Sequence, residues 1–484
     1  MKKAFSLFFI LISYLVYSQN NADIDLSFIQ NNWQRPGTNN TSINSIAIQS
    51  DNKILIGGYF TTFNGSSQNS LIRLNADGSK DTSFNIGSGT TGNVSVRAIA
   101  IQTDGKILVG GDFFTFNGSN LQPYLIRLNS NGTRDTSFSF SAGWEYQLSV
   151  NTIKILSTNK ILIGGNKLAA VTGVSSGFIY RLNTTGSIDT TFNTGLGFDK
   201  VVNTIAIESS GTILIGGSFT KYNNIDKKYI VRLNNNGSIN NSLAIPNPSF
   251  NDSAGIFSIL VQPDNKILLG GYFTVFNNNT QNRLIRISGG GLKDTSFNIG
   301  SGFNGPLAAL AIQSDGKILV GGSFDTFNGS IQNKLVRLNT NGSKDTSFNI
   351  LSGFDSFGVT ELVFQNDGKL LVGGPFGSYK GQTINNRLIR LNGTSNLSNY
   401  EFNNEKTLLY PNPAIDKFTI DFGDELLSNY TIKINNMLGQ EVYSNVINEP
   451  QFEVSKTWQG EGMYFIKIYN ENKNLIGTKK IILQ

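Results

Sequence analysis

The chain has 484 residues, more than one ordinary domain needs, and it contains neither cysteine nor histidine. Because cysteine is missing, a disulfide framework is excluded. Because histidine is missing, the chain lacks the usual general base, the Ser-His-Asp arrangement and the commonest zinc or copper ligand. We therefore expect no cofactor and no metal site. The formal net charge of +6 is mild and its basic residues are not clustered, so we expect no nucleic-acid partner.

Residues 1–18 are typical of a secretory signal peptide. Lys2 and Lys3 precede an almost unbroken apolar run, and Val16 and Ser18 are small enough for a cleavage site before Gln19. The run is too short to span a membrane comfortably, so we expect no transmembrane segment after cleavage.

A Gly-Gly doublet then recurs seven times, each time closing a short apolar run, at intervals of 51 to 54 residues. The doublets are Gly57-Gly58, Gly110-Gly111, Gly164-Gly165, Gly216-Gly217, Gly270-Gly271, Gly321-Gly322 and Gly373-Gly374. A fixed period of this size indicates a propeller, a solenoid or an array. Residues that recur in every copy then serve the fold, and function is to be sought where the repeat is broken.

The second copy shows the pattern within a repeat. Residues 96–102 and 106–111 are apolar runs joined by Asp104-Gly105, a hairpin signal, and residues 124–129 and 133–138 predict a third and a fourth strand. Four short antiparallel strands make one propeller blade. We therefore predict an all-β chain with a seven-bladed β-propeller over residues 19–392.

The ends of the repeat array predict how the ring closes. The fourth-strand motif Asp-Thr-Ser-Phe follows most copies, but the seventh copy stops at Asn392 without it. The related segment Asp25-Leu26-Ser27-Phe28 stands alone at the front of the array. We expect this N-terminal segment to complete the last blade, which removes open sheet edges.

After the array, residues 393–407 form a polar linker, and residues 408–484 predict a small β-sandwich of roughly seven short strands with no helix signal. Its motifs include Tyr-Pro-Asn-Pro, Asn-x-x-Gly-Gln, Gly-x-Tyr and a Lys-Lys-apolar end. The residues of these motifs that we assign to a sorting signal are Pro411, Asn412, Pro413, Gly439, Gln440, Gly462, Tyr464, Lys479 and Lys480.

This combination resembles the type A C-terminal sorting domain of the type IX secretion system. The resemblance implies that the type IX machinery is a partner and that the protein is exported across the outer membrane, to be secreted or held on the cell surface. Residues 22–392 resemble the delta-60 repeat, through segments such as Asp-Gly-Lys-Ile-Leu-x-Gly-Gly-x-Phe. That resemblance implies a β-propeller and no assigned biochemical activity.

The recurrent residues favour structural roles. Glycine in a strand allows a close neighbour, and the recurring aromatic residues after each doublet are typical of a core, since the third copy replaces them by Leu168 and Val171. The recurring arginine is expected to pair with the recurring aspartate of its own blade. A calcium loop at Asn75–Asp81 is a weaker alternative, because hairpin turns also explain Asp-Gly and Asn-Gly there.

Between Gln19 and Asn392 the glutamates are Glu145, Glu208 and Glu361, and each departs from the repeat. Trp144, Glu145 and Tyr146 lie in an odd insertion, where a carboxylate between two aromatic rings suits contact with a carbohydrate. We expect a non-enzymatic binding or scaffold protein that recognises glycan or protein through a propeller face. The alternative is a polysaccharide-active enzyme, a glycosidase or lyase, that uses Asp/Glu chemistry.

Overall fold

The computed structural model describes residues 22–35, 41–90, 94–118, 124–140, 146–169, 175–245, 250–251, 255–355, 358–384, 387–392, 408–422, 430–436, 441–458, 460–469 and 475–483. The chain divides after Thr394 into two compact units. All regular elements in the described ranges are β-strands, which confirms the all-β prediction. The predicted signal peptide, residues 1–18, and the predicted linker, residues 393–407, lie outside these ranges.

Seven three-stranded antiparallel sheets of the first unit are the blades, which we number blade 1 to blade 7 in chain order. Their innermost strands are β2 (Ser42–Ile48), β7 (Val96–Ile101), β10 (Tyr146–Ile155), β13 (Val202–Ile207), β18 (Ile256–Val261), β23 (Leu307–Ile312) and β28 (Glu361–Phe364). The middle strands are β3 (Ile54–Tyr59), β8 (Ile107–Gly111), β11 (Ile161–Ala169), β14 (Ile213–Gly217), β19 (Ile267–Gly271), β24 (Ile318–Gly322) and β29 (Leu370–Gly373). The third strands are β6 (Leu71–Leu74), β9 (Leu125–Leu128), β12 (Ser175–Leu182), β17 (Ile230–Leu233), β22 (Leu284–Ile287), β27 (Leu335–Leu338) and β32 (Leu388–Leu391).

Short two-residue strands form hairpins in the loops between the second and third strands. These are β4 (Thr62–Phe63) with β5 (Ser66–Ser67), β15 (Lys221–Tyr222) with β16 (Ile225–Asp226), β20 (Val275–Phe276) with β21 (Asn279–Thr280), β25 (Thr326–Phe327) with β26 (Ser330–Ile331), and β30 (Ser378–Tyr379) with β31 (Gln382–Thr383). The strand β1 (Trp33–Gln34) pairs with β4. Their aromatic residues, such as Phe63 and Tyr222, are buried, in keeping with a packing role.

The predicted fourth strand is wrong in detail, because each outer edge is only a single β-bridge, such as Leu128↔Arg134. The chain then turns, and the Phe138 amide donates to the Asp135 carbonyl at 3.3 Å. The Asp135 carboxylate also accepts hydrogen bonds from the amide and hydroxyl of Ser137, at 3.0 and 2.6 Å. Such local side-chain bonds compete with a sheet ladder and end the strand.

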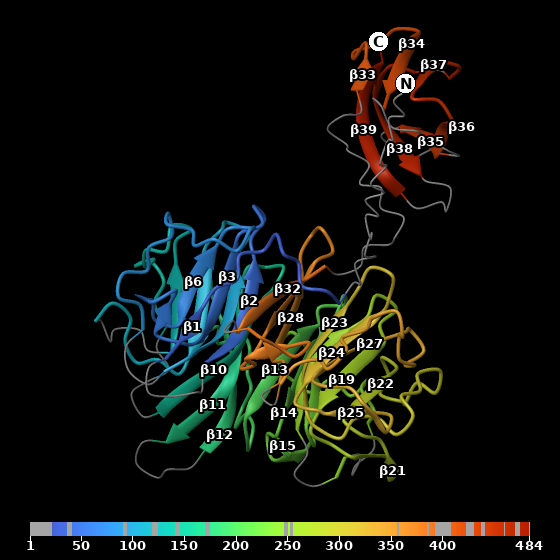
Figure 1. The fold of residues 1–484 in the computed structure, drawn as a ribbon. Helices are drawn as coiled ribbons and strands as arrows, with labels where there is room; N and C mark the ends of the chain where they lie inside the picture. The colour runs from blue at the N-terminus through green and yellow to red at the C-terminus, as the bar shows by residue number, and fades with distance from the viewer. Residues whose placement is uncertain are drawn as a thin grey trace, which may run out of the picture. The chain divides into compact units, whose positions relative to one another are not determined.

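The blades form a closed ring. Each innermost strand contacts the next, and β28 contacts β2, so the first and last blades meet, as the blue and orange strands show in Figure 1. The Asp25 amide donates to the Arg390 carbonyl at 2.8 Å, and Ile24 forms a bridge with Leu391. The N-terminal segment therefore covers the outer edge of blade 7 through a bridge rather than a long strand.

The glycine doublets are explained by two different close approaches. A Cβ on Gly110 would lie 2.6 Å from Cγ1 of Val150 in the next blade, and a Cβ on Gly111 would lie 2.0 Å from the Ser95 carbonyl oxygen of its own blade. The same two neighbours recur around the ring, for instance at Gly57 with Val96. The first glycine thus allows blades to pack together, and the second allows the innermost strand to bulge.

A repeated ion cluster links six of the seven blades to the next blade among the described residues. In blade 2, Asp135 accepts from Arg127 Nε at 2.7 Å and from Lys106 Nζ at 2.9 Å. Arg127 Nη1 also donates to the Thr184 carbonyl of blade 3 at 2.5 Å. The arginine therefore pairs within its blade, as the sequence predicts, and it also links that blade to the next one.

Blade 4 builds the same cluster from different residues. Asn240 stands where the other blades have aspartate and Thr212 stands where they have lysine, while Glu208 replaces the usual glutamine. Arg232 Nη2 donates to Glu208 at 2.6 Å, and the Thr212 hydroxyl donates to the same carboxylate at 2.6 Å. In blade 4 the carboxylate therefore comes from a different loop, and the buried arginine still has a negatively charged partner.

The second unit is a two-sheet sandwich. One sheet has the order β33 (Leu408–Tyr410), β34 (Lys417–Asp421), β37 (Gln451–Ser455), and the other has the order β36 (Glu441–Ile447), β35 (Tyr430–Asn436), β38 (Gly462–Tyr469), β39 (Leu475–Leu483). Alternate residues such as Phe418, Ile434 and Ile466 are buried between the sheets. Over the described residues of both units, nothing helical is both long and apolar enough to cross a bilayer.

Candidate binding site at the central channel

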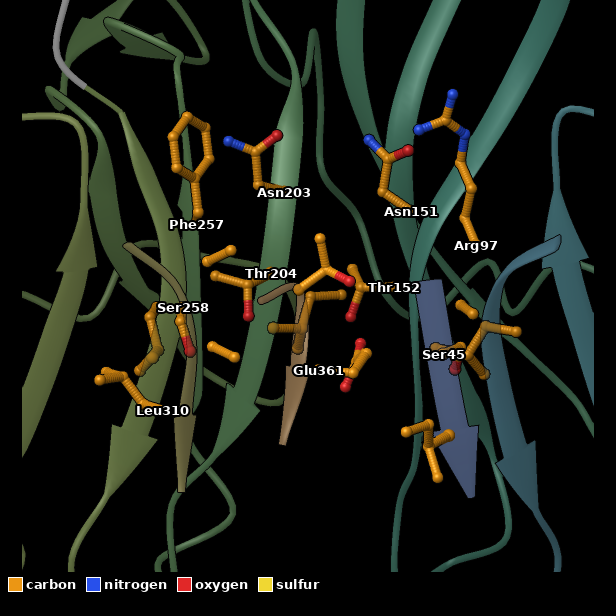
Figure 2. A pocket seen from close by; sticks show the side chains of 18 of the residues that line it. Ser45, Arg97, Asn151, Thr152, Asn203, Thr204, Phe257, Ser258, Leu310 and Glu361 are labelled. Carbon is orange, nitrogen blue, oxygen red and sulfur yellow. The ribbon is translucent and has the colours of Figure 1, made fainter. Parts of the chain in front are cut away.

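β-bulges place residues of several innermost strands at the mouth of the central channel. In six blades the register of the first two strands shifts by one residue, and the bulged residues are Asn44, Arg97, Asn151, Asn203, Phe257 and Ala308. A bulge re-aims the side chain of the extra residue. Figure 2 shows Arg97, Asn151, Asn203 and Phe257 at one level of the channel wall, above a second level that includes Glu361.

A hollow of about 730 Å³, which we call the vestibule, lies at this mouth across blades 2 to 4 and is lined mostly by residues of polar type. Arg97, Asn151 and Asn203 line both the vestibule and the channel below it, so the two spaces adjoin. The vestibule is also lined by Asp112, Asn166 and Lys200. This concentration of amides and charges breaks the pseudo-sevenfold symmetry of the ring.

Blade 3 is extended beside the vestibule. Its first two strands have ten and nine residues, and Ser149 pairs with Asn166 beyond the usual end of the blade. The Ser175 hydroxyl donates to Asn166 at 2.6 Å, and the Ser149 hydroxyl donates to Asn151 at 3.1 Å. These bonds fix the orientation of the two amide side chains.

Arg97 is held in place by one carboxylate. Asp112 accepts from Arg97 Nη2 at 2.9 Å and from Nε at 3.2 Å, while its other oxygen accepts from the Ser95 amide at 2.5 Å. Both oxygens of Asp112 are therefore engaged. The carboxylate positions the guanidinium, whose Nη1 has no hydrogen-bond partner among the described residues and which remains partly exposed.

The two amides at the mouth are anchored to the neighbouring blades. Asn151 Nδ2 donates to the Val202 carbonyl and Asn203 Nδ2 donates to the Ile256 carbonyl, each at 3.1 Å. The oxygen of each amide therefore points away from the carbonyl group to which its Nδ2 donates. Lys200 is exposed on the same rim and forms no ion pair among the described residues.

Blade 5 contributes aromatic surface to the rim. Phe257 is 37% exposed and Tyr272 is 46% exposed, although most aromatic side chains in the propeller are buried. Tyr272 lies under the Arg283 guanidinium, 4.3 Å from it. The mouth thus combines polar groups on blades 2 to 4 with the exposed ring of Phe257 on blade 5.

Below the mouth, the channel encloses about 300 Å³. Its next level carries hydroxyl and methyl side chains on six blades and Glu361 on blade 7 (Figure 2). Enclosure by protein raises the pKa of Glu361 to about 8, and the charge of Lys154 opposes that rise. Enclosure likewise lowers the pKa of Lys154, against the opposing effect of Glu361.

The residues that the sequence singled out have different positions. Trp144 and Glu145 lie outside the described residues, and Tyr146 is described only as the first residue of β10, paired with Ala169. Glu208 is the arginine partner of blade 4, and Glu361 lines the channel. Sequence reasoning missed Arg97, Lys154 and Lys200, although a column-by-column comparison of the seven repeats would have shown each as a departure.

No group of three or more acidic side chains that could hold a metal ion occurs in the described ranges. In the turn of blade 1, Asp77 accepts from the amide and hydroxyl of Ser79 at 2.9 and 2.7 Å. These bonds explain the Asp-Gly turn without an ion.

The predicted sorting-signal residues lie in the second unit. Asn412, between Pro411 and Pro413, accepts from the Ile482 amide at 3.0 Å, so this loop is tied to the last strand. The Tyr464 hydroxyl donates to the Gly460 carbonyl at 3.1 Å. Gly462 begins β38, and Lys479 and Lys480 lie in β39, whereas Gly439 and Gln440 fall outside the described residues.

Two family profiles match the chain. One is described as "Domain of unknown function (DUF5122) beta-propeller" and matches residues 49–84, 102–138, 156–192, 208–243, 262–297, 313–348 and 365–397, together more than half of the chain. The other is described as "Secretion system C-terminal sorting domain" and matches residues 408–484. A comparison with curated proteins finds no match.

Several solved structures are similar at low identity. PorZ, described as an essential surface component of the type IX secretion system of Porphyromonas gingivalis, is 12% identical with a TM-score of 0.42, over 93% of this chain and 60% of that one. The chain therefore spans less than two thirds of PorZ. A catalytically inactive virginiamycin B lyase from Staphylococcus aureus with quinupristin is 14% identical with a TM-score of 0.42, over 75% and 98%. A gluconolactonase from Xanthomonas campestris is 10% identical with a TM-score of 0.33, over 75% and 94%. These likenesses say nothing about activity.

Proposed function

The chain belongs to the DUF5122 beta-propeller family, and from this premise we propose that it is a non-enzymatic binding protein that recognises a glycan at the mouth of its central channel. Its C-terminal sorting domain indicates export by type IX secretion to the cell surface or the extracellular space, where glycans are abundant. The observation that carries the proposal is the loss of symmetry at the bulged residues. A position that serves only packing would be filled alike in every blade, but here it holds Arg97, Asn151, Asn203 and Phe257.

The chemistry of the mouth suits a ligand with many hydroxyl groups. Amides and guanidinium groups can form paired hydrogen bonds with neighbouring hydroxyls, and they are already oriented by Asp112 and by the adjacent blades. An exposed aromatic face offers apolar contact to the C–H surface of a sugar ring, and Phe257 presents such a face at the mouth. Lys200 adds a positive charge, so we expect a preference for glycans that carry carboxylate or sulfate groups.

A polysaccharide-active enzyme is less well supported. Glycoside hydrolysis uses two carboxyl groups with different environments, one able to give a proton. Asp112 has both oxygens engaged by Ser95 and Arg97. Glu361 has a raised pKa, but it lies one level deeper, among hydroxyl side chains of the channel. The described residues of the mouth thus favour binding over turnover.

A glycan array with the chain lacking residues 1–18 tests the proposal. We expect binding to a restricted set of glycans, and at least a tenfold loss of affinity in Arg97→Ala, Lys200→Ser and Phe257→Ala. Lys344→Ser, an exposed lysine on an outer turn of blade 6, is the matched control and should bind like the parent.

Absence of any glycan ligand, or affinity that none of the three substitutions changes, would refute the proposal. If a pull-down captured a protein partner and the capture depended on the same residues, the ligand would be a protein and not a glycan. Release of reducing ends or unsaturated sugars by the parent chain would instead establish the enzyme.

A further inference from the structure

The channel contains two charges that the fold does not require. At the level of Glu361, the other blades carry Ser45, Ala98, Thr152, Thr204, Ser258 and Ala309. At the level of Lys154, two residues further along the strand, they carry Ala47, Ala100, Ala206, Leu260, Ala311 and Val363. Glu361 and Lys154 thus each stand at a position that holds a small or apolar residue in the other six blades.

The two charges lie on opposite sides of the channel. Glu361 belongs to blade 7 and Lys154 to blade 3, which are three blades apart in one direction around the ring and four in the other. They sense each other electrostatically, yet within the described residues they form no ion pair, and neither side chain has a hydrogen-bond partner. Of the other charged groups, Arg97 also lines this space, but Asp112 holds it at the mouth.

Two ionisable side chains of opposite type that face one confined space, with no partner among the described residues, are available to a ligand. Lys154 is exposed to this space and Glu361 is half-buried in it. A charged group removed from bulk water needs a counter-charge or hydrogen bonds to offset its lost hydration. The hydroxyls of Thr152, Thr204 and Ser258 also lack partners among the described residues, and Figure 2 shows them at about the same level of the channel wall as Glu361. The space of about 300 Å³ equals roughly ten waters at their liquid volume, enough for a small organic molecule.

We propose that the central channel binds a small zwitterion of the amino-acid class, whose ammonium group bonds to Glu361 and whose carboxylate bonds to Lys154. The hydroxyls of Thr152, Thr204 and Ser258 would serve as additional hydrogen-bonding groups along the ligand. A ligand with both charges satisfies both walls at once, whereas an ion of one sign would leave one wall unpaired. This site lies below the glycan site and does not depend on it.

The shifted pKa values of the two groups predict a further measurable effect of ligand binding. Because enclosure raises the pKa of Glu361, its carboxyl group is largely protonated at neutral pH when the channel holds no ligand. A bound ammonium group would favour the carboxylate, so the proton of Glu361 is released to the buffer on binding. A hydroxylic ligand without charge would cause no such release.

Isothermal titration calorimetry of the chain lacking residues 1–18 tests this inference. The probes are glycine, β-alanine and 4-aminobutyrate, which differ in charge separation, with ethylamine and propionate as single-charge controls. We expect at least one zwitterion to bind at least tenfold more tightly than either control. Titration near pH 7 in two buffers of different ionisation enthalpy should show proton release.

Glu361→Gln and Lys154→Met should each weaken binding at least tenfold. Because they keep side-chain size, neither should lower the melting temperature. Lys200→Ser, which belongs to the proposed glycan site, should leave zwitterion binding unchanged, so the two proposals can fail separately. No binding by any zwitterion, equal binding by a single-charge control, or binding of a metal cation that needs Glu361 but not Lys154 would each overturn the inference.

Discussion

Replacement of Asp25 by asparagine should weaken the closure of the ring. Asp25 Oδ2 accepts from Arg390 Nε at 2.7 Å and from Lys369 Nζ at 3.1 Å, and Oδ1 accepts from the Ser27 hydroxyl at 2.7 Å. The side chains of Asp25 and Arg390 are 8% and 5% exposed. Asp25→Asn keeps the shape of the side chain but leaves the buried Arg390 without its counter-charge, while Lys369 keeps only Asp367, at 3.7 Å.

Two estimates bound the effect on the free energy of unfolding. Burial alone would raise the pKa of Asp25, but the bonds from Ser27 and Lys369 and the charge of Arg390 outweigh it and lower the pKa from 3.8 to about 2. By linkage, that difference contributes about 2 kcal/mol above pH 4, and the contribution is lost as the pH falls from 4 to 2. Breaking a buried ion pair from one side costs about 3–5 kcal/mol, because the abandoned charge stays buried.

The loss is expected to be about 3 kcal/mol at pH 7. With an unfolding entropy of about 2 cal/mol/K per residue, a propeller of roughly 370 residues should then melt about 4 °C lower. The gap between parent and Asp25→Asn should narrow below pH 4, where the parent loses the same charge. Melting curves followed by circular dichroism between pH 2 and 8 measure both effects.

Blade 4 supplies the compensating change. There Asn240 replaces the aspartate and Glu208 pairs with the arginine. Gln365 occupies the position of Glu208 in blade 7 and already lies 3.3 Å from Arg390 Nη1. Asp25→Asn combined with Gln365→Glu should therefore regain most of the lost stability. Unchanged melting of Asp25→Asn, or no recovery in the double variant, would refute this account of closure.

Three further predictions concern other parts of the chain. Gly110→Ala should cost about 1–3 kcal/mol of stability, because its Cβ would lie 2.6 Å from Val150, whereas Gly270→Ala, whose nearest neighbour is 3.3 Å away, should be nearly neutral in the same melting assay. Glu361→Gln should raise the melting temperature more at pH 9 than at pH 5. The reason is that a carboxyl group with a pKa raised to about 8 loses its stabilising contribution as the pH rises from about 4.5 through 8. An equal effect at both pH values would contradict the pKa assignment. Removal of residues 408–484 should leave a folded propeller in the periplasm, and normal amounts outside the cell would contradict the assigned role of the sorting domain.

Local sequence signals were sufficient for much of the architecture. The Gly-Gly period predicts seven blades because each blade is built from residues close in sequence, and the motifs around Asn412 and Tyr464 identify the sorting domain. The Asp-Thr-Ser-Phe motif was assigned to a strand in error. Its aspartate bonds to the backbone two residues later, and this local bond replaces the sheet ladder.

The candidate sites were decided by tertiary structure. Glu361 stood out in the sequence as one of few glutamates, but nothing in the sequence paired it with Lys154, which lies far away in the chain. The two residues face the same space only because seven blades close around one axis and bring every innermost strand to it. Arg97 reaches the mouth because a bulge, made possible by the glycine doublet opposite it, turns an extra residue out of the ladder. Ring closure and bulge geometry depend on contacts between strands, so they cannot be inferred from a residue's neighbours along the chain.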